Sequence, residues 1–473
     1  MIRTFVSLFL RLSKNSVIKN FSLVTLSTAI TQILGIFVTV KIARFLNVEE
    51  YGVFSFLLVQ GQLLITLGDL GIRNIVIRSI ARDKSKTKDL IYNGLKLRLI
   101  GVISLITFYF VYNFLYGSLS NFQLFLITIF TLTSCFSSLF DAAYWGHEKM
   151  LTPAIISISF SGIWLTVIIF TDNYNANYLF SLFIILNIFK MLISYFALLI
   201  NKILIGLTDN FFSSAKILLT EGWPYLLLTL IMVPSNYLTN NFLDINSSKE
   251  QVGYFNLSNK LMGPITMVLG ISMSAIFPNL SALWSKSEDR FRLAVSNGFQ
   301  YFVLIGVLIT FLFSFLIKEV VIVLFTEKYI EAIKVCQLQI WYVLLMGINS
   351  FIGTVLGAMN KERLILVTGI INAIIAIPIL FYSSYYGALG LSYGYLISFG
   401  LFEVYLWILF KRKTKIIIKS DLLIWTITIL LFFFSYLFID QIIFPIRLIL
   451  GVMIVGFFIY LFVLLKNRNT III

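Results

Sequence analysis

The chain has 473 residues, of which 59% are apolar and 12% charged, and its mean hydropathy is +0.96. Soluble domains carry about 25% charged residues, so this composition excludes a soluble globular protein and predicts one that uses lipid as its solvent. The net charge of +15 would suggest a nucleic-acid partner in a soluble chain. Membrane proteins collect Lys and Arg in cytoplasmic loops, and we therefore expect no nucleic-acid partner here.

Fourteen stretches are long and apolar enough to cross a bilayer as helices, for which about 20 residues suffice. Residues 1–18 alternate short apolar runs with cations, which predicts an interfacial segment ahead of the first span. The predicted spans are 19–43, 50–71, 91–114, 121–143, 153–171, 177–200, 216–243, 254–280, 296–318, 335–358, 363–383, 388–410, 421–439 and 446–465. We predict an all-α integral membrane protein.

The distribution of cations predicts the orientation of the spans. With the N-terminus in the cytoplasm, 27 of the 36 Lys and Arg residues fall on the cytoplasmic side, eight on the other side, and Lys190 inside the sixth span. This asymmetry is the positive-inside pattern, so we predict that both termini are cytoplasmic. The run from Lys411 to Lys415 is explained by this topology or by contact with anionic lipid headgroups.

Two weak internal matches relate spans that are six apart. Residues 49–54 and 250–255 share the pattern E-x-x-G-x-F, at the starts of the second and eighth spans. Residues 146–149 and 358–361 share a small residue and a Lys three positions later, at the ends of the fourth and tenth. The matches predict two parallel six-helix repeats. The predicted divisions are an N-lobe at 19–200, a C-lobe at 216–410 and two extra helices at 421–465.

Enzyme, metal and disulfide motifs are missing from the sequence. The motifs G-x-x-x-x-G-K-[ST] and H-E-x-x-H do not occur, and His147 is the only histidine. The two cysteines, Cys135 and Cys336, lie far apart in apolar stretches. We therefore expect a protein that is not an enzyme and that needs no metal and no cofactor.

Several short runs of glycine, arginine and proline carry a family resemblance. They are Ala43–Leu46, Glu50–Gly52, Gly71–Arg73, Val252–Leu261, Phe277–Leu280, Ala358–Lys361 and Tyr386–Gly390. In these runs, from about residue 20 to 410, the chain resembles the Wzx-type O-antigen and capsule flippases. These belong to the superfamily that includes multidrug exporters and the lipid II flippase.

The resemblance implies two six-helix lobes around a central cavity, in the bacterial inner membrane. It implies a substrate of undecaprenyl diphosphate bearing an oligosaccharide, moved from the cytoplasmic to the periplasmic leaflet. Partners would be this substrate and membrane lipids, with a polysaccharide polymerase and a chain-length regulator as candidate protein partners. The chain departs from the lipid II flippase pattern, because residues 31–38 in the first span carry no charge. An aspartate often found in the seventh span of related flippases is also absent from residues 234–237.

Four cations inside predicted spans or at the end of one are candidate substrate-binding residues. Ionisable groups inside spans are costly and are functional hypotheses by default. Lys41, Arg44 and Lys260 would suit a diphosphate, and the alternative for each is snorkelling to the interface. Lys190 either lines a cavity or pairs with a partner that the sequence does not identify.

A second set of charged residues follows the second span and begins the seventh. Asp69, Arg73, Arg78 and Glu221 either receive the headgroup or pair as an inner gate. The positive-inside pattern explains Arg73 and Arg78 equally well.

Prolines concentrate in the seventh and eighth spans and predict hinges for alternating access. The four are Pro224, Pro234, Pro264 and Pro278. Proline removes a backbone hydrogen bond and bends a helix, and an ordinary transmembrane proline is the alternative.

Two carboxylates, Asp141 and Glu403, also lie in predicted spans, where a structural role is the favoured interpretation. Without an ATP-binding motif, energy would come from an ion gradient, the substrate gradient or consumption of the product. The favoured function is flippase. The alternatives are a cation-coupled multidrug exporter of the same superfamily, an oligosaccharide polymerase and a membrane scaffold.

Overall fold

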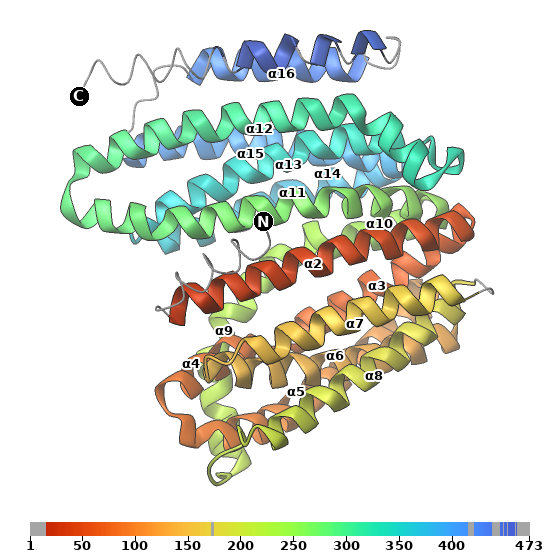
Figure 1. Ribbon diagram of the computed structural model, residues 1–473, viewed down its shortest axis with the longest axis vertical. Coiled ribbons are helices and arrows are strands. Elements are labelled where there is room, and N and C mark those ends of the chain that lie inside the picture. The colour runs from red at the N-terminus through yellow and green to blue at the C-terminus, as the bar shows by residue number, and fades with distance from the viewer. Residues whose placement is uncertain are drawn as a thin grey trace, which may run out of the picture. The chain divides into compact units, whose positions relative to one another are not determined.

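A computed structural model of the chain describes residues 16–171, 175–414 and 421–437, and residues 445–460 except 448, 452 and 459. Regular structure in these residues is helical throughout (Figure 1). Twelve of the described helical stretches are long and apolar enough to cross a membrane, and they match the first twelve predicted spans. The predicted all-α membrane fold is therefore confirmed.

The chain divides into two compact units, with the boundary between Gly253 and Tyr254. Of the predicted interfacial segment, residues 1–15 lie outside the described residues and residues 16–18 begin the first helix. The elements of unit 1 are α2 (Ser16–Phe45), α3 (Val48–Gly68), α4 (Ile72–Arg82), η1 (Lys84–Lys86), α5 (Thr87–Tyr116), α6 (Asn121–Gly146), α7 (Leu151–Phe170), α8 (Ala176–Ile200), α9 (Phe211–Val233), η2 (Pro234–Leu238) and α10 (Thr239–Asn246). The unit boundary falls after α10 because α9 packs against α3, α4 and α5. The predicted lobe division stays a prediction.

Unit 2 begins inside α11, whose first turns belong to unit 1. Its elements are α11 (Lys249–Lys286), α12 (Glu288–Phe325), η3 (Glu327–Tyr329), α13 (Ala332–Ala358), α14 (Glu362–Ser384), α15 (Gly387–Thr414) and α16 (Asp421–Leu437). Where the last two spans are predicted, the described residues form shorter apolar helices, at Thr428–Leu437 and Pro445–Phe458. Crossing of the membrane by these two helices stays a prediction.

Side-chain caps and one sharp turn let consecutive helices follow each other closely. Asn47 caps α3 by accepting a hydrogen bond from a backbone N–H three residues later, and Ser120 forms a capping box with Gln123 at the start of α6. Such caps satisfy N–H groups that a first helical turn leaves unpaired. The chain reverses between α3 and α4 at Leu70 and Gly71, with φ of 51° and 70°. Glycine adopts this left-handed conformation without strain.

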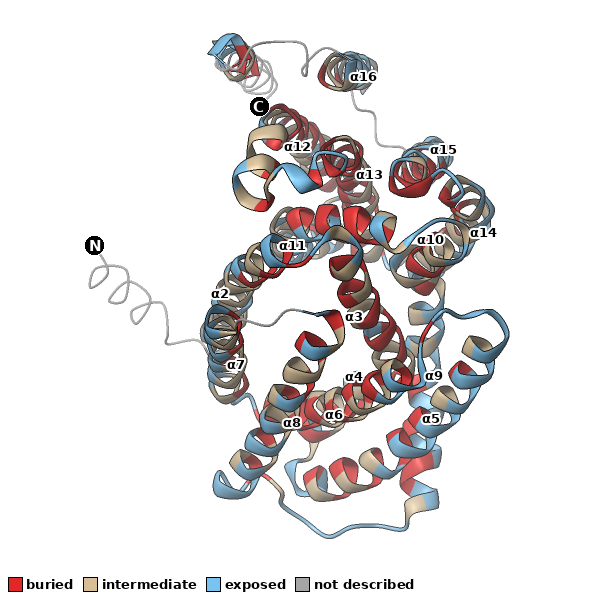
Figure 2. Ribbon diagram, turned by 90° about the vertical axis from the view of Figure 1, so that its right-hand side faces the viewer, coloured by how far each residue is buried: buried red, intermediate tan, exposed pale blue. Residues whose placement is uncertain are grey.

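Buried and exposed residues are distributed unevenly over the helices (Figure 2). Buried residues run along much of α3 and α6, whereas α5 keeps large apolar side chains exposed, such as Phe114 at 89%. In unit 1, Ile72 and Ile75 of α4 are buried in a cluster with Leu139 of α6. Exposed apolar faces of this kind are stable where lipid covers them.

Candidate functional site

A buried ion pair joins the α3–α4 turn to α5. Arg98 of α5 is fully buried, and its guanidinium pairs with the carboxylate of Asp69, at the end of α3. The guanidinium also donates to the carbonyl oxygen of Cys135 at 2.6 Å and to the hydroxyl of Ser138 at 2.7 Å. Removing one partner would leave the charge of the other uncompensated, so each residue requires the other in this fold. Sequence reasoning counted Arg98 only among the cations of the cytoplasmic side, although its position inside a predicted span was a signal.

Asp69 and Arg73, two predicted gate residues, lie on this turn. The Asp69 carboxylate accepts a hydrogen bond from the backbone N–H of Arg73 at 3.4 Å. The Arg73 guanidinium lies over the ring of Trp145, 4.9 Å from its centre. Asp69 thus orients the first turn of α4, and the side chain of Arg73 turns toward α6.

Arg78 and Glu221, the other two predicted gate residues, form an ion pair between α4 and α9. Nearby, a Cβ on Gly71 would overlap the carbonyl of Gly222, so the two backbones approach at a distance that only glycine permits. The side chains of Arg78 and Glu221 are 41% and 44% exposed. An ion pair this exposed contributes about 0–1 kcal/mol and can open at low cost.

The seventh span changes helix type at Pro234. Residues 234–238 form the π-helical turn η2, and the hydroxyl of Tyr237 shares a hydrogen bond of 3.0 Å with that of Thr66 in α3. Such π-turns recur at functional sites. Pro224 lies inside α9, and Pro264 and Pro278 lie inside the continuous helix α11. The hinge role of all four prolines stays a prediction.

The two copies of the E-x-x-G-x-F pattern lie against each other at their glycines. A Cβ on Gly253 would lie 2.7 Å from the carbonyl oxygen of Val48, and one on Gly52 would overlap the carbonyl of Lys249. Each glycine therefore contacts the backbone at the start of the other helix. This reciprocal contact is what two repeats related by a two-fold axis would make.

A polar cluster at Lys249 lies beside the glycine contact. The Lys249 ammonium pairs with Asp244 of α10, donates to the hydroxyl of Ser118 at 2.9 Å, and lies 3.8 Å from the centre of the Phe56 ring. Ser118 also donates to Asp244 at 2.7 Å. Sequence reasoning missed this cluster, because nothing in the spacing links residues 118, 244 and 249.

The predicted substrate-binding cations have different surroundings. The Lys41 ammonium lies 4.1 Å from the centre of the Phe45 ring, and Arg44 is exposed on the same helix. Lys260 of α11 is exposed and has no ion-pair or hydrogen-bond partner among the described residues. Substrate binding by these three cations stays a prediction.

Lys190 of α8 is half-buried and contacts an aromatic ring. Its ammonium lies 5.2 Å from the centre of the Phe160 ring. The carboxyl group of Asp141 in α6 lies within electrostatic range of both Lys190 and Arg73. No ion pair joins Lys190 to Asp141 among the described residues, and both predicted roles of Lys190, cavity lining and pairing, stay predictions.

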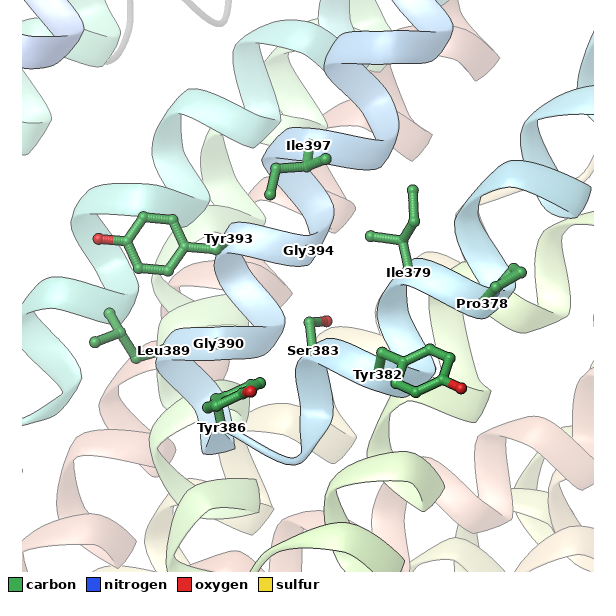
Figure 3. A pocket seen from close by; sticks show the side chains of 10 residues that line it. All are labelled: Pro378, Ile379, Tyr382, Ser383, Tyr386, Leu389, Gly390, Tyr393, Gly394 and Ile397. Carbon is green, nitrogen blue, oxygen red and sulfur yellow. The ribbon is translucent and has the colours of Figure 1, made fainter.

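Unit 2 has an open apolar groove of about 710 Å³ between α14 and α15 (Figure 3). Three tyrosines, Tyr382, Tyr386 and Tyr393, lie along it, and no lining residue is charged. Its glycines, Gly390 and Gly394, allow α14 to approach α15 closely. An uncharged groove of this kind does not suit a diphosphate.

The described residues contain no group of three or more His, Cys, Asp or Glu side chains that could hold a metal ion. Cys135 and Cys336 are buried and free, in different units.

The fold is shared with membrane transporters of known structure. The lipid II flippase MurJ, in an inward closed conformation, matches with a TM-score of 0.73 and 15% identity, over 94% of this chain and 99% of that one. An inward-facing multidrug resistance transporter of the MATE family matches with a TM-score of 0.65 and 14% identity, over 81% and 94%. A MOP superfamily transporter from Pyrococcus furiosus matches with a TM-score of 0.58 and 12% identity, over 85% and 95%. The fold is therefore that of MOP superfamily transporters.

Residues 17–284 match the family described as polysaccharide biosynthesis protein, and this is more than half of the chain. The protein belongs to this family. The matched region contains the Asp69–Arg98 and Arg78–Glu221 pairs and both copies of the repeated glycine pattern. Comparison of the sequence with curated proteins gives no match.

Proposed function

We propose that the protein is a flippase that moves undecaprenyl-diphosphate-linked oligosaccharides from the cytoplasmic to the periplasmic leaflet by alternating access. The observation that carries this proposal is the match to polysaccharide biosynthesis proteins in a chain that folds like a lipid II flippase. The chain has twelve candidate spans in its described residues. A protein that takes part in polysaccharide biosynthesis and has a transporter fold would move a biosynthetic intermediate across the membrane. The simplest such intermediate is a lipid-linked oligosaccharide that passes from one leaflet to the other.

We assign recognition of the diphosphate to Lys41, Arg44 and Lys260. Lysine ammonium and arginine guanidinium groups form charge-assisted hydrogen bonds with phosphate oxygens. Lys190 is the weakest candidate of the predicted four, because its charge already acts on Asp141.

We assign the inner gate to Arg78 and Glu221, with Asp69 and Arg73 orienting α4. Opening would break an exposed ion pair and separate Gly71 from Gly222, while the buried Asp69–Arg98 pair keeps the turn intact. The proposal includes a location in the bacterial inner membrane with both termini cytoplasmic. A polysaccharide polymerase and a chain-length regulator are candidate partners.

A second candidate function is cation-coupled multidrug export. It is favoured by the match to a multidrug resistance transporter of the MATE family, over 94% of that chain. Acidic residues would then bind cationic drugs, and Asp141 and Glu403 are the carboxylates within spans that this function would use.

The test is to deplete the protein from cells and determine which leaflet holds the lipid-linked oligosaccharides, using a periplasmic sugar-modifying enzyme. We expect complete repeat units to accumulate on the cytoplasmic side. Lys41→Ala and Lys260→Ala should reproduce part of this accumulation, and Lys216→Ala, an exposed lysine of α9, should not. Units that reach the periplasm but stay unpolymerised would indicate a polymerase instead. Unchanged transfer with lost drug resistance would indicate a drug exporter.

A further inference from the structure

Glu403 is a buried carboxyl group for which the described part of the chain supplies no polar partner. It lies on α15 with 3% of its surface exposed, and neither carboxylate oxygen has a hydrogen-bond partner among the described residues. No ion pair reaches it among these residues either. By contrast, the Glu319 carboxylate of the same unit pairs with Arg447 at 2.5 Å.

Aromatic layers lie on both sides of Glu403. Residues four positions apart share one face of a helix, so Phe399 and Trp407 lie one turn before and one turn after Glu403 on its face. The Phe399 ring meets Tyr342 of α13 edge to face, with ring centres 4.8 Å apart. Trp407 stacks on Phe299 of α12 with ring centres 4.7 Å apart. Glu403 therefore lies on the α15 face that packs against α12 and α13.

The helices packed around α15 offer Glu403 no charge. No Asp, Glu, Lys, Arg or His occurs in α12 between Arg292 and Lys318, in α13 after Lys334, or in α14 after Arg363. None occurs in α11 between Lys260 and Lys286. On α15 itself, the next charged residue is Lys411, whose ammonium lies 5.3 Å from the centre of the Trp407 ring.

The other titratable groups on these elements are phenols and one thiol. They are Tyr254, Tyr301, Tyr342, Tyr382, Tyr393, Tyr395, Tyr405 and Cys336. Tyr342 contacts Phe399, one turn before Glu403, and its hydroxyl donates to the sulfur of Met346 at 4.0 Å. It therefore supplies no hydrogen bond to the carboxyl group.

An ionised carboxylate in these surroundings would be an uncompensated charge, which is costly in a protein interior, whereas the neutral acid avoids that cost. A metal cation needs several oxygen ligands, and the neighbouring side chains are aromatic rings instead. We propose that Glu403 is a reversible proton-binding site within unit 2, protonated in the described conformation, and that its proton exchange drives the transport cycle. The proton would be taken up from water by the Glu403 carboxylate and returned to water from the neutral acid. The coupling to transport rests on the proposed function.

Infrared spectroscopy of the full-length protein in lipid bilayers tests proton binding directly, because a protonated carboxyl group has a C=O stretching band that a carboxylate lacks. We expect this band at neutral pH in the wild type and its loss in Glu403→Gln, which resembles the neutral acid in shape and should fold. Glu362→Gln, which changes an exposed carboxyl group of α14, should retain the band. A spectrum in which Glu403→Gln removes no band would overturn the proposal. Loss of the wild-type band when Na⁺ is added at constant pH would assign the site to a metal cation and also overturn it.

Transport in vesicles tests the coupling, with undecaprenyl-diphosphate-linked oligosaccharide as the probe. We expect an imposed pH gradient to accelerate transport by the wild type and by Glu362→Gln, and this acceleration to be lost in Glu403→Gln. Equal acceleration in all three would overturn the coupling. If the wild type moves no probe while the infrared band behaves as expected, the proposed function fails and the proton-binding site stands.

Discussion

Lys190 and Glu403 lie near the middle of the sixth and the twelfth candidate span, one in each unit, and their surroundings differ. In unit 1, Lys190 acts on Asp141, and the fully buried Arg98 pairs with Asp69. In unit 2, Glu403 has neither an ion pair nor a hydrogen bond within the described residues. The fully buried charge of Arg98 is thus compensated by Asp69. The uncompensated Glu403 is better explained by function, since an unpaired ionisable group in a span gives no stability.

The largest effect is expected at Arg98. Arg98→Met would leave the Asp69 carboxylate without its buried partner, and losing one partner of a buried pair costs about 3–5 kcal/mol. Unfolding of the purified variant in detergent should show this loss. Asp69→Asn combined with Arg98→Met should recover most of it, because no charge is left buried. If Arg98→Met alone were as stable as the wild type, Arg98 would not be needed to compensate the charge of Asp69.

A smaller effect is expected at Lys190. Lys190→Met removes one of the two cations that act on Asp141, while Arg73 remains. We expect a loss of at most about 1 kcal/mol, because both side chains are half-buried and no hydrogen bond or ion pair joins them among the described residues. Lys190→Met in an Asp141→Asn background should cost less than in the wild type. If Lys190→Met lowered the free energy of unfolding equally in both backgrounds, Lys190 and Asp141 would not interact.

The exposed pair Arg78–Glu221 should affect transport more than stability. Arg78→Gln is expected to change the free energy of unfolding by about 0–1 kcal/mol, because water competes for both groups. Transport of the lipid-linked oligosaccharide should change clearly if the pair is a gate. The exchange of Arg78→Glu together with Glu221→Arg should restore transport, and failure to do so would count against the gate.

His147 gives unit 1 a weak dependence on pH. Burial, and secondarily Lys84 and Lys149, lower the pKa of His147, whose ring shares a hydrogen bond of 2.8 Å with Thr87. Because the folded state binds the proton less readily than the unfolded state, stability is full above about pH 6.5 and falls as the pH drops below it. The melting temperature should therefore decrease between about pH 7 and about pH 5. His147→Asn should remove part of this decrease, and an identical decrease in the variant would exclude His147 as its source.

The smallest effect on stability is expected at Glu403. Replacing a neutral carboxyl group that makes no hydrogen bond within the described residues removes no stabilising interaction. Glu403→Gln and Glu403→Leu should therefore unfold at or above the wild-type temperature. A matched removal of compensated charge in unit 1, Arg98→Met, should be strongly destabilising. If Glu403→Gln were as destabilising as Arg98→Met, the contrast between the two units would fail.

Sequence reasoning predicted the helical elements well and the contacts between them poorly. The first twelve spans were located because a bilayer requires about 20 consecutive apolar residues, a condition that acts along the chain. The repeated glycine pattern was also visible, but the reciprocal contact of Gly52 and Gly253 was not. Of the site, the sequence identified Arg78 and Glu221 as gate candidates, and the structure showed that they pair.

The sequence by itself determined that this is a helical membrane protein, where twelve of its spans lie, and which ionisable residues the membrane must accommodate. Only the tertiary structure decided that Asp69 compensates Arg98, and that no side chain within the described residues compensates Glu403. The physical reason is that the two properties depend on residues at different separations along the chain. Hydrophobic length is a property of neighbouring residues, whereas compensation of a buried charge depends on side chains that packing brings together from distant helices.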